Sequence, residues 1–200
     1  VLNMKRYSVI IKLESPLHLG TGHADVIVDA EAARDEFGMP IFPGKRLKGL
    51  LYESALEIAE INPDMFFGKG DVEKLFAQSA DDNVNESALR VENFHLPNYE
   101  EMCNGWEYLR EKYSGLFTSN EVWESYSELR TQIAIDNKLG TAKDGALRNI
   151  RAVDAGLSFI GNIILMDPNP VNEKILKYAV LNLRYAGSKR NRGFGRIKCT

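Results

Sequence analysis

The order of strand-like and helix-like segments constrains the fold of this 200-residue chain more than any other feature. β-Branched and aromatic residues predict strands at residues 7–13, 89–96, 157–165 and 194–199. Apolar positions that recur every three or four residues predict two helices, one after Pro43 and Gly44 and one after Pro170. The order of strand, helix, strands, strand, helix and strand predicts an α+β fold with one ferredoxin-like βαββαβ core.

The segments between these elements predict one domain, residues 1–200, with insertions. One insertion covers about residues 64–87, with a short helix over 72–77. A second covers about residues 98–128 and is acidic, aromatic and helical in character. Strand character returns at 131–136, followed by a polar loop over 137–145 and a return strand over 147–153, which predicts a hairpin. Neither an internal repeat nor a second hydrophobic core is evident.

The composition is that of a soluble globular protein, with 44% hydrophobic and 26% charged residues. The sequence has no run of about 18 apolar residues and no secretory signal pattern at its start, so we expect a cytoplasmic protein without a membrane partner. Cys103 and Cys199 are far apart and form no CxxC pair. A zinc site needs about four clustered ligands, so we expect no structural zinc and two inert thiols.

The charge is distributed unevenly along the chain. Its net charge is −3, yet residues 174–200 contain eight basic side chains and no acidic one. The first 173 residues therefore carry a net charge of −11. This asymmetry predicts a basic face that binds a polyanion, although a solvated basic tail is the alternative.

The segment from Gly187 to Arg196 combines glycines, cations and one aromatic residue between a helix and a strand. The glycines let the backbone approach a phosphate closely, and they are Gly187, Gly193 and Gly195. The cations neutralise phosphates, and they are Lys189, Arg190, Arg192 and Arg196. The ring of Phe194 is predicted to stack on a base. The alternative is an ordinary connection with solvated charges.

The first turn of the predicted helix after Gly44 contains three cations, Lys45, Arg46 and Lys48. The helix dipole disfavours positive charge at this end, whereas free backbone N–H groups there bind anions. Cations at this place therefore indicate a bound phosphate. Simple tolerance at an exposed helix end is the alternative interpretation.

These two segments resemble motifs of the RAMP superfamily of CRISPR-associated proteins. The stretch from Gly38 to Gly49, GMPIFPGKRLKG, resembles the G-x-P-x-I-P-G-x-x-L-K-G signature. The stretch Arg192–Arg196 resembles the C-terminal glycine loop, and Ser15–Gly20 resembles the first strand and turn of the family. The resemblance covers roughly residues 5–61 and 129–200.

Within the superfamily the chain resembles the repeated backbone subunit of type III effector complexes. The resemblance implies an RRM-like core that binds the CRISPR guide RNA, with target RNA, other complex subunits and neighbouring copies of the chain as further partners. It also implies a thumb-like hairpin over about residues 131–147. Such a subunit accepts any guide sequence, so contacts to phosphates and 2′-hydroxyls are expected to dominate.

The resemblance also implies a catalytic carboxylate in the acidic loop before the basic helix. Asp29 and Asp35 match the family spacing of two aspartates separated by five residues and followed by P-x-x-P-G. We therefore assign target-RNA cleavage to Asp29, which would also hold Mg²⁺ or another divalent cation. The other carboxylates of the loop are expected to be solvated, and they are Asp25, Glu31, Asp35 and Glu36.

Two other functions remain open from the sequence. In a binding-only backbone subunit, Asp29 is inert. In a metal-independent guide-processing endoribonuclease, a histidine near the N-terminus, His18 or His23, acts as general acid and base. His95 is expected to lie on a strand face. The enzyme assignment therefore depends on Asp29, and the roles of residues 64–128 stay open.

Overall fold

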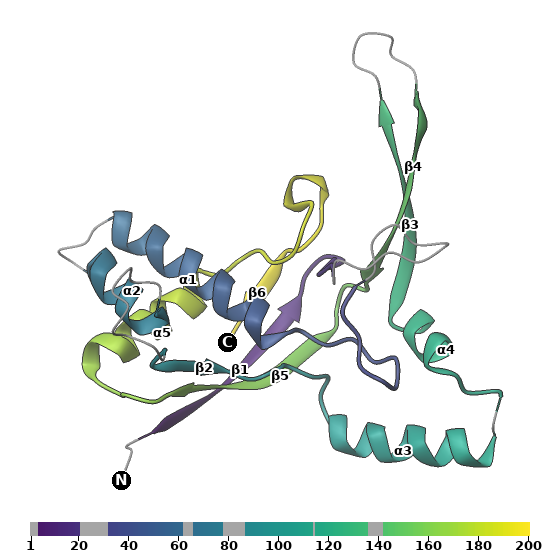
Figure 1. The fold of residues 1–200 in the computed structure, drawn as a ribbon, viewed down its shortest axis with the longest axis horizontal. Helices are drawn as coiled ribbons and strands as arrows, with labels where there is room; N and C mark the ends of the chain where they lie inside the picture. The colour runs from purple at the N-terminus through teal and green to yellow at the C-terminus, as the bar shows by residue number, and fades with distance from the viewer. Residues whose placement is uncertain (1–3, 21–31, 62–65, 78–86, 114, 136–141) are drawn as a thin grey trace.

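The computed structural model describes residues 4–20, 32–61, 66–77, 87–113, 115–135 and 142–200. The elements follow the order β1 (Lys5–Leu13), α1 (Gly44–Ile61), α2 (Lys69–Phe76), β2 (Leu89–Val91), α3 (Tyr99–Lys112), α4 (Ser119–Glu124), β3 (Ser127–Ile135), β4 (Ala142–Val153), β5 (Ser158–Leu165), α5 (Pro170–Asn182), the 3₁₀ turn η1 (Arg190–Arg192) and β6 (Ile197–Cys199). Figure 1 shows α1, α2 and α5 grouped together, with α3, α4 and the β3–β4 hairpin at the opposite end of the molecule.

The core is a four-stranded antiparallel sheet with the strand order β2-β5-β1-β6. The two central strands pair from Lys5 opposite Leu165 to Lys12 opposite Ser158. Helix α1 lies between β1 and β2 in the chain, and α5 connects β5 to β6. This is the ferredoxin-like βαββαβ arrangement, so the predicted α+β fold class is confirmed.

Alternation in the strands determines which face of the sheet meets the helices. In β1, Val9, Ile11 and Leu13 are buried, whereas the residues between them are exposed. Their apolar partners come from α1 and α5, which pack against each other. The α1 side chains at the predicted apolar positions are all buried, and they are Leu47, Leu51, Ala55 and Ile58. No described helix is long and apolar enough to cross a membrane.

The strand predicted over residues 89–96 is shorter than expected. β2 ends at Val91, and only single bridges follow, from Phe94 to Phe42 and from His95 to Ile160. The cause is the start of α1, which crosses this strand closely. The side chain of Asn93 accepts the backbone N–H of Gly44 at 2.9 Å. A β-carbon at Gly44 would overlap the carbonyl oxygens of Val91 and Glu92, so only glycine fits there.

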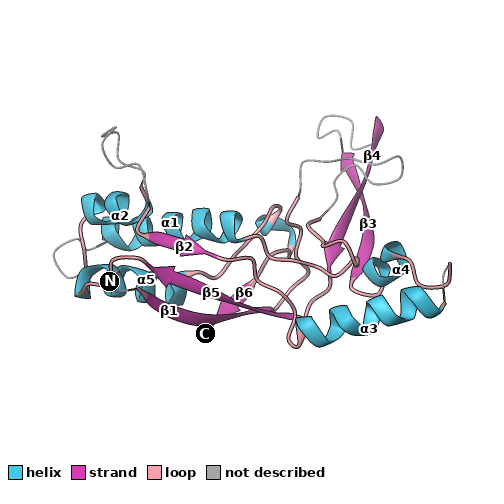
Figure 2. Cartoon of the chain, turned by 60° about the horizontal axis from the view of Figure 1, so that its bottom comes forward, coloured by secondary structure: helices cyan, strands magenta, loops and turns pink. Residues whose placement is uncertain are grey.

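The predicted insertions contain the helices expected of them, since α2 lies within residues 64–87 and α3 and α4 lie within 98–128. The hairpin is longer than predicted, because β3 begins at Ser127 and β4 at Ala142, inside the expected loop. Residues 136–141 lie outside the described part of the chain. The described β3 side chains from Glu128 to Ile133 are all exposed or half-buried, so this stretch lacks the alternation that marks a half-buried strand. Figure 2 shows the hairpin projecting away from the sheet.

Candidate nucleic-acid interface

The turn that follows β1 connects the sheet, the hairpin and the segment Gly187–Arg196, which is called the glycine loop from here on. Leu17 exchanges two backbone hydrogen bonds with Val153 at the end of β4, at 2.9 and 2.8 Å. The buried His18 ring places Nδ1 2.7 Å from the carbonyl oxygen of Arg151, so Nδ1 carries the donated proton. The carbonyl of His18 accepts the backbone N–H of Ser188 at 3.1 Å. Leu17 therefore holds the base of the hairpin, and the next residue, His18, holds the glycine loop.

Two of the three predicted glycines serve the packing of the chain itself. Gly187, Gly193 and Gly195 all have positive φ angles, of 74°, 78° and 76°. A β-carbon on Gly187 would overlap the carbonyl oxygen of His18, and one on Gly195 would overlap that of Ala186. Only Gly193 has open space around the position of a β-carbon. Of the three glycines predicted to admit a phosphate, only Gly193 therefore has the open space that a close approach needs.

Two cations of the glycine loop converge on the hairpin. The Lys189 ammonium donates to the Gln132 side-chain oxygen on β3, and the Arg192 guanidinium lies 3.5 Å from the same oxygen. Burial lowers the pKa of Lys189, and the positive charges of Arg192 and Arg148 lower it further. Arg148 lies on β4, directly opposite Gln132. We call Lys189, Arg192 and Arg148 the loop–hairpin cluster; none of its members forms an ion pair with a carboxylate in the described part of the chain.

The other two cations of the glycine loop have carboxylates nearby, which come from distant parts of the chain. Arg190 donates to the Gly187 carbonyl at 3.2 Å and lies 4.0 Å from Glu53 of α1. Arg196 forms an ion pair with Glu14 at 2.9 Å. Both pairs are exposed to solvent, where such pairs contribute roughly 1 kcal/mol or less. A phosphate can therefore compete for either cation at small cost.

Phe194 does not have the exposure that base stacking requires. Its side chain is 6% exposed and packs with Ile150 and Ala152 of β4. The guanidinium of Arg130 lies over the ring, 5.6 Å from its centroid. The predicted stacking role is thus corrected, since the ring attaches the glycine loop to the hairpin and its face is already covered.

The cations at the start of α1 differ in their surroundings. Lys45 and Arg46 are exposed, and Arg46 donates to the Gly20 carbonyl at 3.1 Å, whereas burial lowers the pKa of Lys48. The N–H groups of Arg46 and Leu47 both bond to the carbonyl of Pro43. With Gly44 bonded to Asn93, the helix end offers few free backbone donors. An anion at this place would therefore be bound mainly by the side chains.

The predicted catalytic residue, Asp29, lies outside the described residues, as do Asp25, Glu31 and His23. Asp35 is described, and its role is structural. Its carboxylate accepts the backbone N–H groups of Phe37 and Met39 at 3.0 and 2.8 Å and the Tyr99 hydroxyl at 2.8 Å. The described residues contain no group of three or more potential metal ligands.

The hairpin side of this candidate interface was not predicted from the sequence. Gln132 accepts a hydrogen bond from Lys189, and Arg148 lies close enough to lower the pKa of Lys189. Arg130 lies over the ring of Phe194. No sequence motif distinguishes these residues, because polar residues of a hairpin are ordinarily expected to be solvated. Their proximity to the glycine loop, which begins 39 or more residues later in the chain, follows from the fold alone.

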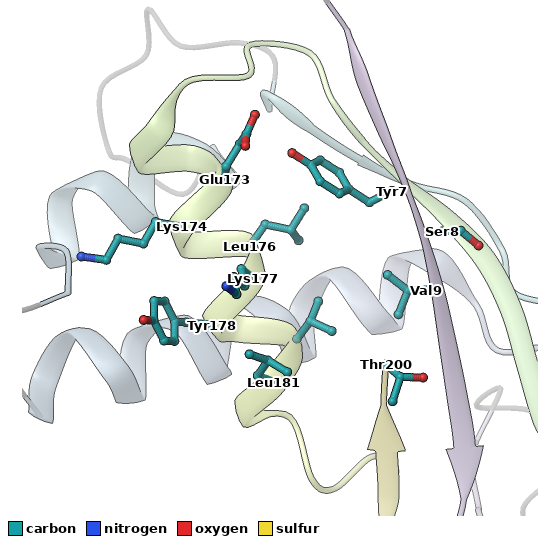
Figure 3. A pocket seen from close by; sticks show the side chains of 11 residues that line it. Tyr7, Ser8, Val9, Glu173, Lys174, Leu176, Lys177, Tyr178, Leu181 and Thr200 are labelled. Carbon is teal, nitrogen blue, oxygen red and sulfur yellow. The ribbon is translucent and has the colours of Figure 1, made fainter.

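A cavity of about 550 Å³ between β1 and α5 contains none of the predicted site residues. Figure 3 shows Tyr7 of β1 and Leu176 of α5 pointing toward each other across it. Its lining is largely apolar, which does not suit a phosphate backbone.

Comparison with known proteins supports the sequence resemblance. The chain is 23% identical over 205 aligned positions to the CRISPR system Cms endoribonuclease Csm3 of Methanocaldococcus jannaschii, covering 94% of this chain and 75% of the relative. Two cryo-EM structures of a type III-B Cmr-beta complex contain similar chains. In the apo state the TM-score is 0.68 at 14% identity, and with cognate target RNA bound it is 0.69 at 15% identity. Each alignment covers 98% of this chain and 96% of the other.

The family itself follows from a match that spans nearly the whole chain. The model of the RAMP superfamily matches residues 10–198, which include the turn after β1, the start of α1 and the glycine loop. The motifs that suggested the family thus occur within one continuous match, on the ferredoxin-like core expected of it. The chain belongs to the RAMP superfamily.

Proposed function

We propose that this chain is an RNA-binding backbone subunit of a type III CRISPR effector complex, which acts in the cytoplasm and holds the guide RNA alongside target RNA and other subunits. The loop–hairpin cluster is the observation that carries the proposal. Three cations from two distant segments meet, none of them paired with a carboxylate of the described residues, and the two arginines add to the lowering of the pKa of Lys189 that burial causes. A polyanion at this place would relieve their repulsion.

The chemistry of the cluster favours the RNA backbone over the bases. Lysine and arginine contact phosphates, whereas base recognition needs exposed aromatic platforms or polar groups aimed at base edges. The one aromatic residue of the glycine loop, Phe194, is buried. Binding is therefore expected to be indifferent to sequence and to weaken steeply as salt rises.

A titration of single-stranded RNA, followed by fluorescence anisotropy at several salt concentrations, tests this proposal. Lys189→Gln combined with Arg192→Gln removes two cluster charges and should reduce affinity about tenfold or more for every sequence. If each cation contacts one phosphate, the slope of log K against log salt should become shallower by about 1.4. Lys74→Gln combined with Lys177→Gln, on α2 and α5, is the matched control. Equal effects of the two double variants would contradict this site.

We also propose that the subunit cleaves target RNA through Asp29 with Mg²⁺ or another divalent cation. The relative from Methanocaldococcus jannaschii is named an endoribonuclease, which supports the assignment. Asp35 supports it indirectly, because its bonds to Phe37, Met39 and Tyr99 anchor the segment that follows the acidic loop. The metal would supply Lewis-acid stabilisation of charge on the scissile phosphate.

Cleavage of a guide-complementary RNA by the assembled complex, comparing wild type with Asp29→Ala, separates a nuclease from a binding-only subunit. Loss of cleavage with unchanged RNA binding is expected. Unchanged cleavage would leave the chain as a binding-only subunit. Guide processing through His18 finds no support in the geometry, since this ring is buried and its Nδ1 is bonded to Arg151. Cleavage that survives metal chelation would nevertheless revive that alternative.

A further inference from the structure

One face of the four-stranded sheet is exposed, opposite the helices α1 and α5. Its residues are the alternate positions of each strand, and those that matter here are Arg6, Ile10 and Lys12 of β1, Arg90 of β2, Ile160 of β5 and Lys198 of β6. We call this surface the open face. All six side chains are exposed.

The centre of the open face is apolar. Ile10 and Ile160 lie directly opposite each other in the β1–β5 register and are 41% and 38% exposed. Single exposed aliphatic residues are common, but two that face each other at the middle of a sheet form a continuous patch. An apolar centre within a charged rim is the usual anatomy of a protein–protein interface.

The rim of the open face is basic. Lys12 and Lys198 are paired in register, although like charges in this arrangement repel. Arg6 and Arg90 both lie opposite Ile164, at the other end of the face. Among these four cations only Arg6 approaches a carboxylate of the described residues, with Glu92 at 4.0 Å. The face therefore suits an occupant that brings both negative charge and apolar contact.

The exposed side of α3 has the complementary character. Glu100, Asn104, Glu107 and Glu111 follow the spacing i, i+4, i+7 and i+11 and so form one stripe along the helix. The three glutamates are exposed and form no ion pair with a described residue. Tyr108, 57% exposed, lies beside the stripe, and the ammonium group of Lys112 donates to its hydroxyl at 2.9 Å and lies 5.3 Å from the centroid of its ring.

The dimensions of the two surfaces agree. On the open face, Arg6 and Lys12 lie six residues apart along β1, which is about 20 Å. The stripe from Glu100 to Glu111 spans eleven residues of a helix, which is about 17 Å. A helix can thus lie along β1 with its glutamates near both cationic ends and Tyr108 over the isoleucines.

The α3 of the same chain is not in a position to do this. Only its first turn borders the face, since Glu100 lines one pocket with Ile160, and the rest of the helix extends away beyond the end of the sheet (Figures 1 and 2). We therefore propose that the open face of one copy of this chain binds the acidic stripe on α3 of a second copy. The inference rests on the proposed role as a repeated backbone subunit, and it names the surfaces that join neighbours. Because the two surfaces differ, the contact is heterologous and can continue from copy to copy.

RNA is the less suitable occupant of the open face. A sheet that binds single-stranded RNA offers aromatic rings on which bases stack. The described positions of this face offer isoleucines at the centre, and the aromatic residue of β1, Tyr7, lies on the opposite side and lines the cavity next to α5.

Sedimentation velocity of the full chain without RNA, at rising protein concentration and low salt, tests the proposal. The wild type should show a sedimentation coefficient that rises with concentration. Lys12→Glu with Lys198→Glu should abolish this rise, as should Glu107→Lys with Glu111→Lys. A mixture of the two reversed variants should restore it, because each reversed surface then meets an oppositely charged partner. Lys74→Glu with Lys177→Glu is the control and should behave as wild type, and circular dichroism verifies that each variant is folded.

Results that differ from these expectations would overturn the proposal. A wild type that stays monomeric at every concentration, or reversed variants that associate normally, would exclude the contact. Failure of the mixture to restore association would exclude the pairing of these two surfaces. If reversal of Lys12 and Lys198 weakened RNA binding and left association unchanged, the open face would be an RNA surface. Loss of RNA binding in the Lys189 and Arg192 variant concerns the proposed function alone, since those residues lie outside both surfaces.

Discussion

The carbonyl oxygen of His18 occupies the place that a β-carbon on Gly187 would need. His18 also bonds through this oxygen to Ser188 and through its ring to Arg151. The glycine loop is therefore pressed against the turn after β1, and the same turn holds the hairpin. The positions of Lys189 and Arg192 relative to Gln132 depend on this close approach.

Alanine at Gly187 should destabilise the protein more than alanine at Gly193. Both glycines have a positive φ, which costs an L-residue about 1–2 kcal/mol. Gly193→Ala should show only this cost, because its β-carbon would meet nothing within 4 Å. Gly187→Ala adds the overlap with His18 and should exceed that range. Urea denaturation of both variants measures the difference, and equal free energies of unfolding would contradict the assigned packing.

Substitutions of Phe194 distinguish packing from base stacking. Phe194→Ala removes a buried ring and should cost about 3–5 kcal/mol of stability. Phe194→Leu keeps an apolar side chain of similar shape and should cost much less, with RNA affinity within about twofold of wild type. A stacking role predicts instead that leucine weakens RNA binding by about 1–3 kcal/mol, as loss of a base platform does. Anisotropy titrations of the leucine variant therefore decide between them.

Much of the core was predictable because its elements carry periodic apolar residues. The helix α1 shows its buried positions directly in the spacing of Leu47, Leu51 and Ala55. The hairpin was located but its ends were not, because the described stretch from Glu128 to Ile133 buries no side chain and so has no alternating pattern. β2 ends earlier than predicted because α1 crosses it closely at Gly44, and no local sequence pattern indicates this crossing.

The site was predictable in part. The motif located the cations of the glycine loop, but a local sequence does not show that Phe194 turns inward or that Arg190 and Arg196 meet Glu53 and Glu14. Those partners lie far away in the chain. Asp35 was expected to be solvated, although an aspartate followed by a glycine three residues later is a common turn. Its bond to Tyr99 arises from tertiary structure.

His18→Leu should act on stability and leave catalysis intact. The substitution removes the donor to the Arg151 carbonyl, and an unsatisfied buried acceptor costs about 1–3 kcal/mol. Thermal denaturation should show a lower Tm. RNA cleavage by the assembled complex, measured well below that Tm, should remain near the wild-type rate. A complete loss of cleavage in a folded variant would instead indicate a role of His18 as general acid or base.

Tyr99 should ionise later than the exposed tyrosines as pH rises. Burial raises the pKa of Tyr99, and its hydrogen bond to the Asp35 carboxylate raises it further. Because the folded state holds this proton more tightly than the unfolded state, the associated stability is present at neutral pH and is lost above the ordinary phenol pKa of about 10. Ultraviolet titration of phenolate formation should lack its last step in Tyr99→Phe. An unchanged titration curve would contradict the bond to Asp35.

The two thiols should differ sharply in reactivity. Burial raises the pKa of Cys199 to about 12, whereas Cys103 is only partly buried. Since the thiolate is the reactive form, iodoacetamide at pH 8 should alkylate Cys103 first and leave Cys199 unmodified until the protein unfolds. The folded state keeps the Cys199 proton that the unfolded chain releases near pH 8.5, so stability should fall as pH rises from there toward 12. Mass spectrometry of digested samples, taken with and without urea, measures both modifications. Equal rates at the two thiols in the folded protein would contradict the burial of Cys199 in the core.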